Sequence, residues 1–200
     1  PYSGRMSICS FGPQSYPYPW FTRSNVGAHF GGELKRAGYD GLIVTGASDE
    51  PVRLLIRDDE VQILPADDLW GADALDTLDA IAAAEGKGAR SLTIGPAGER
   101  LSRIATIQTA SSSACGHGGF GAVMGSKKLK AISVIGSGRV ALADPERVAE
   151  LTRLVGAEAR TMWNAKDRVK ALNERLRAEL GEGARVRVYA CTESCVSPCN

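Results

Sequence analysis

The sequence predicts an α+β protein in which a β-sheet-rich domain over residues 1–140 is followed by the beginning of a helical domain over residues 141–200. Short runs rich in Val, Ile and Leu, separated by Gly, Pro and Asp, recur through the first region, and this pattern is typical of strands joined by turns. At Asp144 the composition shifts to a long helical pattern, with Asp144 as N-cap and Pro145 at the first helical position. We therefore place the domain boundary near residue 140.

The first predicted elements follow the order of the chain. Residues 10–25 are rich in Pro, Ser and aromatic residues, so we expect irregular structure with extended pieces. A short helix is expected over residues 32–37, ended by Gly38. Strands are expected in residues 41–46, 51–59 and 60–66. Asp58 and Asp59 form a candidate hairpin turn between the last two strands.

The later elements include a longer helix over residues 73–86, with Leu75, Leu78 and Ile81 on one side. Further strands are expected in residues 91–95, 104–110 and 130–138. The helical pattern of the second domain runs either as one helix or as two pieces divided near residues 163–164.

The bulk composition excludes several classes of function. Of the 200 residues, 44% are hydrophobic and 24% are charged, which is an ordinary globular composition. A formal net charge of +1 argues against bulk attraction to nucleic acid or to a membrane surface. No apolar run approaches the roughly 20 residues of a membrane span, so we expect neither a nucleic-acid partner nor a membrane span. Because no initiator Met opens the sequence, we expect the N-terminus to be incomplete.

The five cysteines are unevenly distributed, and Cys191, Cys195 and Cys199 lie within the last ten residues. An odd number of cysteines is a poor disulfide framework, whereas clustered thiolates in a reducing cytoplasm favour a metal or iron–sulfur site. Thiolates bind both zinc and iron, so the residues alone leave both metals open. Cys9 and Cys115 stand alone, and Cys115 is expected to be a small packing residue rather than a ligand.

A glycine-rich stretch, residues 111–136, invites three interpretations. Gly116, Gly118 and Gly121 have the dinucleotide-binding spacing G-x-G-x-x-G, but small polar residues precede them where that motif requires a hydrophobic strand. A phosphate loop would place Lys directly after Gly, whereas residues 125–127 read Gly-Ser-Lys. The third interpretation is a tight turn, in which small side chains and successive free N–H groups would let an anionic ligand approach the backbone.

Four longer segments carry a resemblance. They are "GAHFGGELKRAGYDGLIVTGASDEPVRLLI" from residue 27, "ADDLWG" from residue 66, "IGPAGERLSRIATI" from residue 94 and "GHGGFGAVMGSKKLKAISV" from residue 116. In this order they resemble segments of the tungsten-containing aldehyde ferredoxin oxidoreductase family. The resemblance extends from about Arg5 to Val140, which is most of the chain.

The resemblance implies that residues 1–140 form the family's N-terminal domain, which cradles a bis-pyranopterin cofactor with one tungsten (or molybdenum) and a magnesium ion bridging the phosphates. Sulfur atoms of the cofactor then hold the tungsten, so no protein ligand set for it is expected. Matching positions assign cofactor binding to Arg5, Asn25, Gly27, Ala114, Gly116, His117 and Gly118. Asn25 and Ala114 also match the residues that meet magnesium, and a backbone oxygen suits this hard cation.

The sequence departs from the family where Ser113 and His117 replace two arginines of the usual Arg-Ala-Ala-Gly-Arg. This change implies weaker anchoring of the phosphates, unless a lysine compensates. Lys127, Lys128 and Lys130 are expected at a solvated edge, with one of them in reach of phosphate. His117 is expected to donate a hydrogen bond to the pterin, with a catalytic acid as the alternative role, and no other catalytic residue is assigned.

The resemblance also implies a [4Fe–4S] cluster beside the tungsten, with Cys191, Cys195 and Cys199 as three of its ligands. The family spacing is Cys-x2-Cys-x3-Cys, whereas three residues fill the first gap here. The family's fourth cysteine lies far downstream, so we expect the C-terminus of this chain to be missing.

The implied function is oxidation of an aldehyde to a carboxylate, with electrons passing through the cluster to ferredoxin or another electron-transfer subunit. A reductase similar to the benzoyl-coenzyme A reductases of the family is the enzymatic alternative, because nothing in the N-terminal domain separates the two reactions. A cofactor-binding fragment without turnover is the third hypothesis, and the fragment alone is expected to be inactive. We expect a cytoplasmic protein, and a homodimer is left open.

Overall fold

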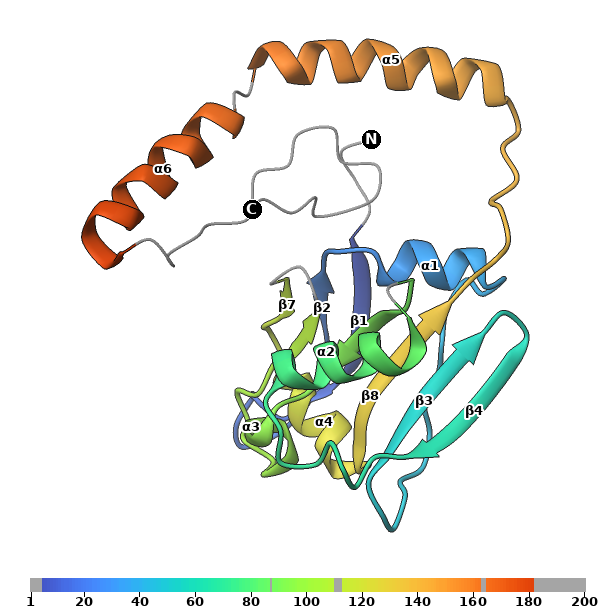
Figure 1. Ribbon diagram of the computed structural model, residues 1–200. Helices are drawn as coiled ribbons and strands as arrows, with labels where there is room; N and C mark the ends of the chain where they lie inside the picture. The colour runs from blue at the N-terminus through green and yellow to red at the C-terminus, as the bar shows by residue number, and fades with distance from the viewer. Residues whose placement is uncertain (1–4, 87, 110–112, 163–164, 182–200) are drawn as a thin grey trace. The chain divides into compact units, whose positions relative to one another are not determined.

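The computed structural model describes residues 5–86, 88–109, 113–162 and 165–181 (Figure 1). Two compact units divide the chain, Arg5–Val140 and the residues from Ala141 onward. Among the described residues, no helix combines the length and the apolar character that crossing a membrane requires.

The centre of the first unit is a six-stranded sheet with the order β4-β3-β8-β5-β6-β7. Its strands are β3 (Val52–Arg57), β4 (Glu60–Pro65), β5 (Arg90–Thr93), β6 (Ile107–Thr109), β7 (Ala114–Cys115) and β8 (Leu129–Ile135). Strand β8 runs parallel to β3 and antiparallel to β5, and residues 129–134 are all buried. Figure 1 shows helix α2 in front of this sheet. The mixture of a largely antiparallel sheet with helices confirms the predicted α+β class.

A separate two-stranded sheet is formed by β1 (Met6–Gly12) and β2 (Trp20–Val26), so the extended pieces expected within residues 10–25 are regular paired strands and only residues 13–19 between them are irregular. The two strands pair antiparallel over their full length. The rings of Phe11 and Phe21 pack edge to face, with their centroids 5.7 Å apart. The prolines lie in the connection between the strands, where the ladder requires no N–H group. The hairpin itself was not predicted, because composition does not reveal that the aromatic residues on either side of the connection pair with each other.

Residues 41–46, predicted as a strand, form none, and Ile43 is 89% exposed. A strand needs a neighbour for its backbone hydrogen bonds, and residues 41–46 pair with none of the six strands of the sheet. The segment is fixed instead by the side chain of Lys127, which donates a 2.7 Å hydrogen bond to the carbonyl oxygen of Gly46. The hairpin turn predicted at Asp58 is confirmed, since Arg57 pairs with Glu60 across it.

Two helices of the first unit lie against the sheet, α1 (Phe30–Arg36) against β8 and α2 (Ala74–Glu85) against β5. The side chain of Asp73 caps α2 by accepting hydrogen bonds from the first-turn N–H groups, and these bonds lower the pKa of its carboxyl. Leu78 and Ile81 are buried as predicted, but Leu75 is 59% exposed and the predicted apolar side is wrong there.

The short helices α3 (Pro96–Glu99) and α4 (Phe120–Ser126) approach each other so closely that both need glycine. A Cβ atom on Gly125 would lie 2.0 Å from the carbonyl oxygen of Gly98. A Cβ atom on Gly98 would lie 2.8 Å from the carbonyl oxygen of Gly121. Real Cβ atoms essentially never come closer than 3.0 Å, so this contact excludes any larger residue.

Lys130 of β8 is fully buried, and protein groups surround its ammonium. Its Nζ lies 2.5 Å from Oε1 of Glu99 and donates a 2.7 Å hydrogen bond to the carbonyl oxygen of Ala72. The Glu99 carboxylate also accepts the N–H of Gly71, at 2.9 and 3.0 Å. The ion pair therefore ties α3 and the chain before Asp73 to the central strand, and it corrects the solvated edge expected for Lys130.

In the second unit the described elements are α5 (Pro145–Met162) and α6 (Ala165–Leu180). The carboxylate of Asp144 accepts the N–H of Arg147 at 2.8 Å, which confirms the predicted N-cap. The predicted division at residues 163–164 lies outside the described residues, and so does the cysteine cluster at positions 191, 195 and 199.

We expect Lys130→Met to lower the free energy of unfolding by about 3–5 kcal/mol, because the buried Glu99 carboxylate loses its counter-ion. The double variant Lys130→Met, Glu99→Leu should lose about 0.5–3 kcal/mol less free energy of unfolding than the sum of the losses in the two single variants. Urea unfolding of wild type, both single variants and the double variant measures this difference. Strictly additive losses would contradict a direct ion pair.

Candidate functional site

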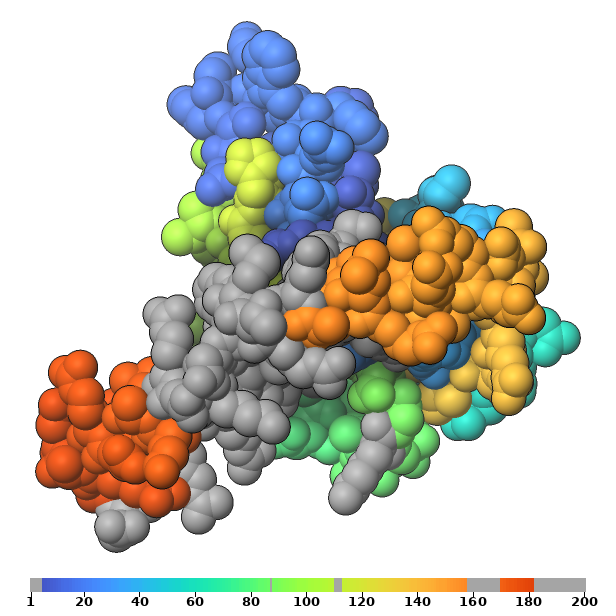
Figure 2. Space-filling view, turned by 90° about the horizontal axis from the view of Figure 1, so that it is seen from above, coloured from blue at the N-terminus to red at the C-terminus, as the bar shows by residue number. Residues whose placement is uncertain are grey.

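The two sequence segments that carry the predicted cofactor-binding residues meet where β2 ends and β7 begins. The N–H of Gly27 donates a 2.9 Å hydrogen bond to Oγ of Ser113. Asn25 lies two residues before Gly27, and Ala114 directly follows Ser113. In Figure 2 the yellow-green atoms of the loop after β7 border the blue atoms of the β1–β2 hairpin. The fold thus gathers Asn25, Gly27 and Ala114 in one place.

The loop from Gly116 to Gly119 is held against the hairpin by its own amide groups. The N–H of His117 donates to Oγ of Ser24 at 3.2 Å, and the N–H of Gly118 donates to Oε1 of Gln14 at 2.7 Å. The ring of His117 is exposed, with Nε2 3.4 Å from Oγ1 of Thr22. The successive free N–H groups expected for this loop are therefore not found at residues 117 and 118, which already have protein partners.

Arg5 and Asn25 lie on the outer side of the hairpin. Asn25 is exposed, and its Oδ1 accepts a 2.8 Å hydrogen bond from the hydroxyl of Ser7, its direct partner in the ladder. Side chains alternate along a strand, so Arg5, two residues before Ser7, continues the same side. The two residues are therefore neighbours of one another at the end of the hairpin where Gly27 follows β2.

The glycines of the loop differ in what surrounds them. Gly118 has φ +85°, and a Cβ atom on it would lie 2.8 Å from the ring of Phe120. Gly119 has φ +71°, and its Cβ would lie 2.1 Å from the carbonyl oxygen of Arg103. Gly116 is exposed, and a Cβ on it would meet no atom within 4 Å. The missing side chain at Gly116 leaves open space beside the backbone, and this space fits the close approach of a bound cofactor.

Cys115 of β7 is fully buried in the hydrophobic core. Burial raises the pKa of its thiol, although a hydrogen bond with Ser24 opposes the shift. A thiol held neutral inside the core is a poor metal ligand, which agrees with the packing role expected for it. No group of three or more His, Cys, Asp or Glu side chains suited to a metal ion occurs in the described part of the chain.

The lysines that follow the loop do not face the site. The Nζ of Lys127 donates to the carbonyl oxygen of Gly46, that of Lys128 to the carbonyl oxygen of Asp49, and that of Lys130 to Glu99. All three groups hold neighbouring backbone or α3 in place. These contacts do not support compensation for the missing arginines by one of the lysines, which stays a prediction.

Sequence reasoning missed the residues that fix the loop, namely Gln14, Thr22 and Ser24. Thr22 and Ser24 alternate with exposed residues along β2, which is a strand signal. This alternation alone did not predict the strand, because the surrounding prolines and aromatic residues suggested irregular structure and the pairing of β1 with β2 was not known.

The loop leaves a strand of two residues and enters a helix of seven, which differs from the long strand–helix unit of dinucleotide-binding folds. Comparison with known proteins identifies the class. Residues 1–136 match the family model described as "Aldehyde ferredoxin oxidoreductase, N-terminal domain". The chain therefore belongs to the aldehyde ferredoxin oxidoreductase family, and the resemblance seen in the sequence is confirmed.

Individual relatives carry more specific names. A tungsten-containing aldehyde ferredoxin oxidoreductase of Thermococcus kodakarensis is 43% identical over 154 residues, which cover 76% of this chain and 25% of the relative. The Pyrococcus furiosus protein of the same name is 39% identical over the same shares of the two chains. Another Pyrococcus furiosus protein, named "Aliphatic sulfonate oxidoreductase, WOR-like subunit", is 35% identical over 163 residues, covering 74% of this chain and 26% of that one.

Among solved structures, the active-site complex of a benzoyl-coenzyme A reductase with 1,5-dienoyl-coenzyme A is similar to this chain. The TM-score is 0.68 at 30% sequence identity, and the match covers 94% of this chain and 26% of the other. The chain thus spans about a quarter of the length of the proteins that it matches.

We expect Gly116→Ala to leave the free energy of unfolding nearly unchanged and Gly118→Ala to lower it. The first adds a methyl group in open space and should change the free energy of unfolding by less than about 0.5 kcal/mol. The second forces an L-residue into the left-handed region against the Phe120 ring and should cost about 1–2 kcal/mol or more. Thermal and urea unfolding of the two variants measure the difference, and equal losses would contradict the distinction drawn between these glycines.

Proposed function

We propose that this chain is the pterin-binding domain of a tungsten-dependent oxidoreductase that converts an aldehyde and water into a carboxylate. The observation that carries the proposal is the hydrogen bond from Gly27 to Ser113, because it joins the two segments on which the resemblance places cofactor-binding residues. The names of the relatives from Thermococcus and Pyrococcus, which are tungsten-containing aldehyde ferredoxin oxidoreductases, support the substrate class.

In this proposal each of the gathered residues has a role at the cofactor. Asn25 and Ala114 would hold a magnesium ion through oxygen atoms, which suits a hard cation. Arg5 contacts phosphate, and the exposed ring of His117 donates a hydrogen bond to the pterin. Gly27 and Gly118 shape the backbone around the site, and Gly116 leaves room for the cofactor. When bound, the tungsten–pterin cofactor supplies the two-electron redox chemistry, and the protein supplies position and electrostatics.

The proposed reaction takes its second carboxylate oxygen from water and releases two electrons and three protons for each aldehyde that is oxidised to a carboxylate. A [4Fe–4S] cluster would pass these electrons singly to ferredoxin or to another electron-transfer subunit in the cytoplasm. Cys191, Cys195 and Cys199 would supply three of its four ligands, with the fourth from outside these 200 residues. A zinc site at the same cysteines is the competing assignment.

A reductase is the second candidate function, and the likeness to the benzoyl-coenzyme A reductase complex favours it, because that match covers nearly the whole chain. The same residues would hold the cofactor in either reaction, so the N-terminal domain does not decide between them. Redox-dye assays of the whole protein decide the direction. Dye reduction by aldehydes supports oxidation, whereas activity only with a reduced dye and an oxidised acceptor substrate supports the reductase.

We expect the whole protein, purified from its native host, to contain roughly one tungsten (or molybdenum) and two pterins per chain. Gly116→Val should abolish cofactor retention without unfolding the protein, since the side chain fills the open space at the site. Gly41→Val is the matched control, because a Cβ there also meets no atom within 4 Å. Metal analysis and pterin fluorescence measure the content. A correctly folded native protein without metal and pterin would refute the proposal, and full loading of Gly116→Val would refute the role of Gly116.

The cysteine cluster is tested separately, by low-temperature EPR of the dithionite-reduced holoprotein. Cys195→Ser should change or remove the reduced-cluster signal and slow electron transfer, while tungsten content stays close to wild type, because cofactor sulfurs hold the tungsten. Cys9→Ser is the control, since Cys9 is an exposed residue of β1. An unchanged cluster signal in Cys195→Ser, or bound zinc without iron, would contradict the assignment.

A further inference from the structure

The segments that form the candidate site contain no acidic side chain, and most of the basic side chains near them already have protein partners. The first acidic residue of the chain is Glu33, and none lies between Glu99 and Asp144, so both segments that form the site lack carboxylates. The lysines after the loop are engaged with backbone oxygens or with Glu99. Arg103 is engaged as well, since its guanidinium donates to the carbonyl oxygens of Pro13 and Ser15. An anion at this site must therefore be met by other cations.

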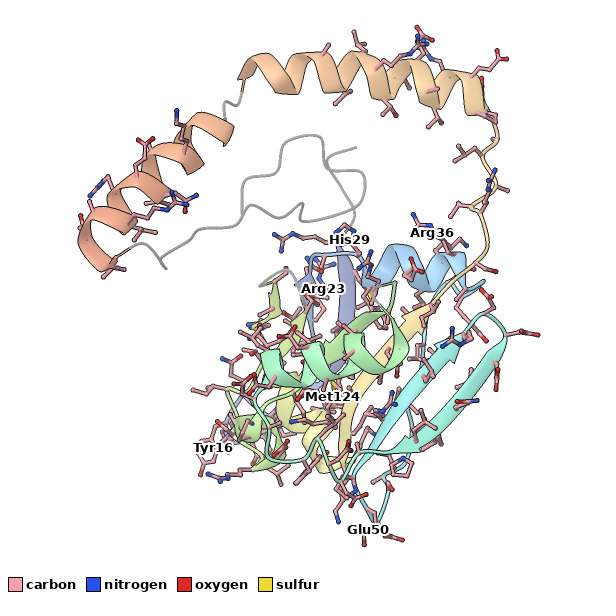
Figure 3. All side chains as sticks on the ribbon, viewed as in Figure 1. Tyr16, Arg23, His29, Arg36, Glu50 and Met124 are labelled. Carbon is pink, nitrogen blue, oxygen red and sulfur yellow. The ribbon has the colours of Figure 1, made fainter. Side chains whose placement is uncertain are left out.

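The position of Arg23 would allow it to contact an anion bound at the candidate site. It is exposed on β2, two residues before Asn25, so both side chains leave the same side of the strand about 6.6 Å apart. Cys9 is its direct partner across the ladder, and the side chain of Arg23 makes no hydrogen bond or ion pair with any described residue. Figure 3 labels Arg23 on β2, with His29 beyond the end of that strand.

We propose that Arg23 binds a phosphate group of the cofactor and, together with Arg5, supplies the positive charge of the site; this inference rests on the proposed function. An arginine presents several N–H donors in a fixed plane and matches phosphate with two parallel hydrogen bonds. The outer side of the hairpin, with Ser7, Cys9 and Asn25 as neighbours, offers no carboxylate to compete for it. Neither β1 nor β2 carries an acidic side chain that could neutralise the charge of Arg23, so a bound anion would do so.

The test uses the whole protein with its cofactor and measures the rate at which pterin is released on dilution, followed by pterin fluorescence. Arg23→Gln should release pterin about ten- to a hundredfold faster, the range expected for loss of a charge-assisted hydrogen bond. Arg23→Lys keeps the charge but not the paired donors, so its rate of pterin release should lie between those of wild type and Arg23→Gln. The control is Arg57→Gln, which makes the same change in charge at an exposed end of β3.

The outcomes separate this inference from the proposed function. Faster release in Arg23→Gln, with unchanged thermal unfolding and partial rescue by Arg23→Lys, supports it. Release from Arg23→Gln at the rate of Arg57→Gln overturns it while leaving the proposed function intact. Unchanged release with slower electron transfer to a protein acceptor also overturns it, because Arg23 would then dock an acidic partner. Wild-type protein that never contains pterin overturns both proposals.

Discussion

The direct contact between the backbones of α3 and α4 is the constraint on which the rest of the candidate site depends. Gly98, Gly121 and Gly125 meet neighbouring carbonyl oxygens so closely that no side chain fits. This contact fixes α4 relative to α3, and the buried pair of Lys130 and Glu99 fixes α3 relative to the central strand. The loop after β7 leads into α4, so its position follows from the same contacts. Helix, strand and loop therefore form one rigid arrangement behind the site.

The hairpin completes this arrangement from the opposite side. A Cβ atom on Gly12 would lie 2.7 Å from the carbonyl oxygen of Gly118, so the hairpin also approaches the loop backbone to backbone. The side chains of Gln14 and Ser24 then bond the amides of Gly118 and His117. Most glycines around the loop thus serve packing or a left-handed conformation. The sequence does not distinguish them from Gly116, where a Cβ atom would meet no atom within 4 Å, because a glycine required for packing and one in open space are the same residue.

Local signals predicted the elements that depend on local interactions. The N-cap at Asp144, the turn at Asp58 and the strand that became β8 all follow from residues close in sequence. The β1–β2 hairpin and the failed strand at residues 41–46 depend instead on which segments become neighbours. The burial of Lys130 also depends on residues far away in the sequence, since Glu99 and Ala72 supply the partners that stabilise its ammonium inside the protein. A lysine beside a glycine-rich loop suggests solvent or phosphate unless those partners are known.

The candidate site shows the same division between what sequence can and cannot predict. The resemblance named Asn25, Gly27 and Ala114, and the bond from Gly27 to Ser113 brings their segments together. Gln14 and Ser24 escaped notice because their role is to hold the loop rather than a ligand. These two bonds satisfy the amides of residues 117 and 118 inside the protein. Under the proposed function, recognition of an anionic cofactor would therefore depend on outward-facing side chains and on the space at Gly116, because the backbone amides of residues 117 and 118 already have protein partners.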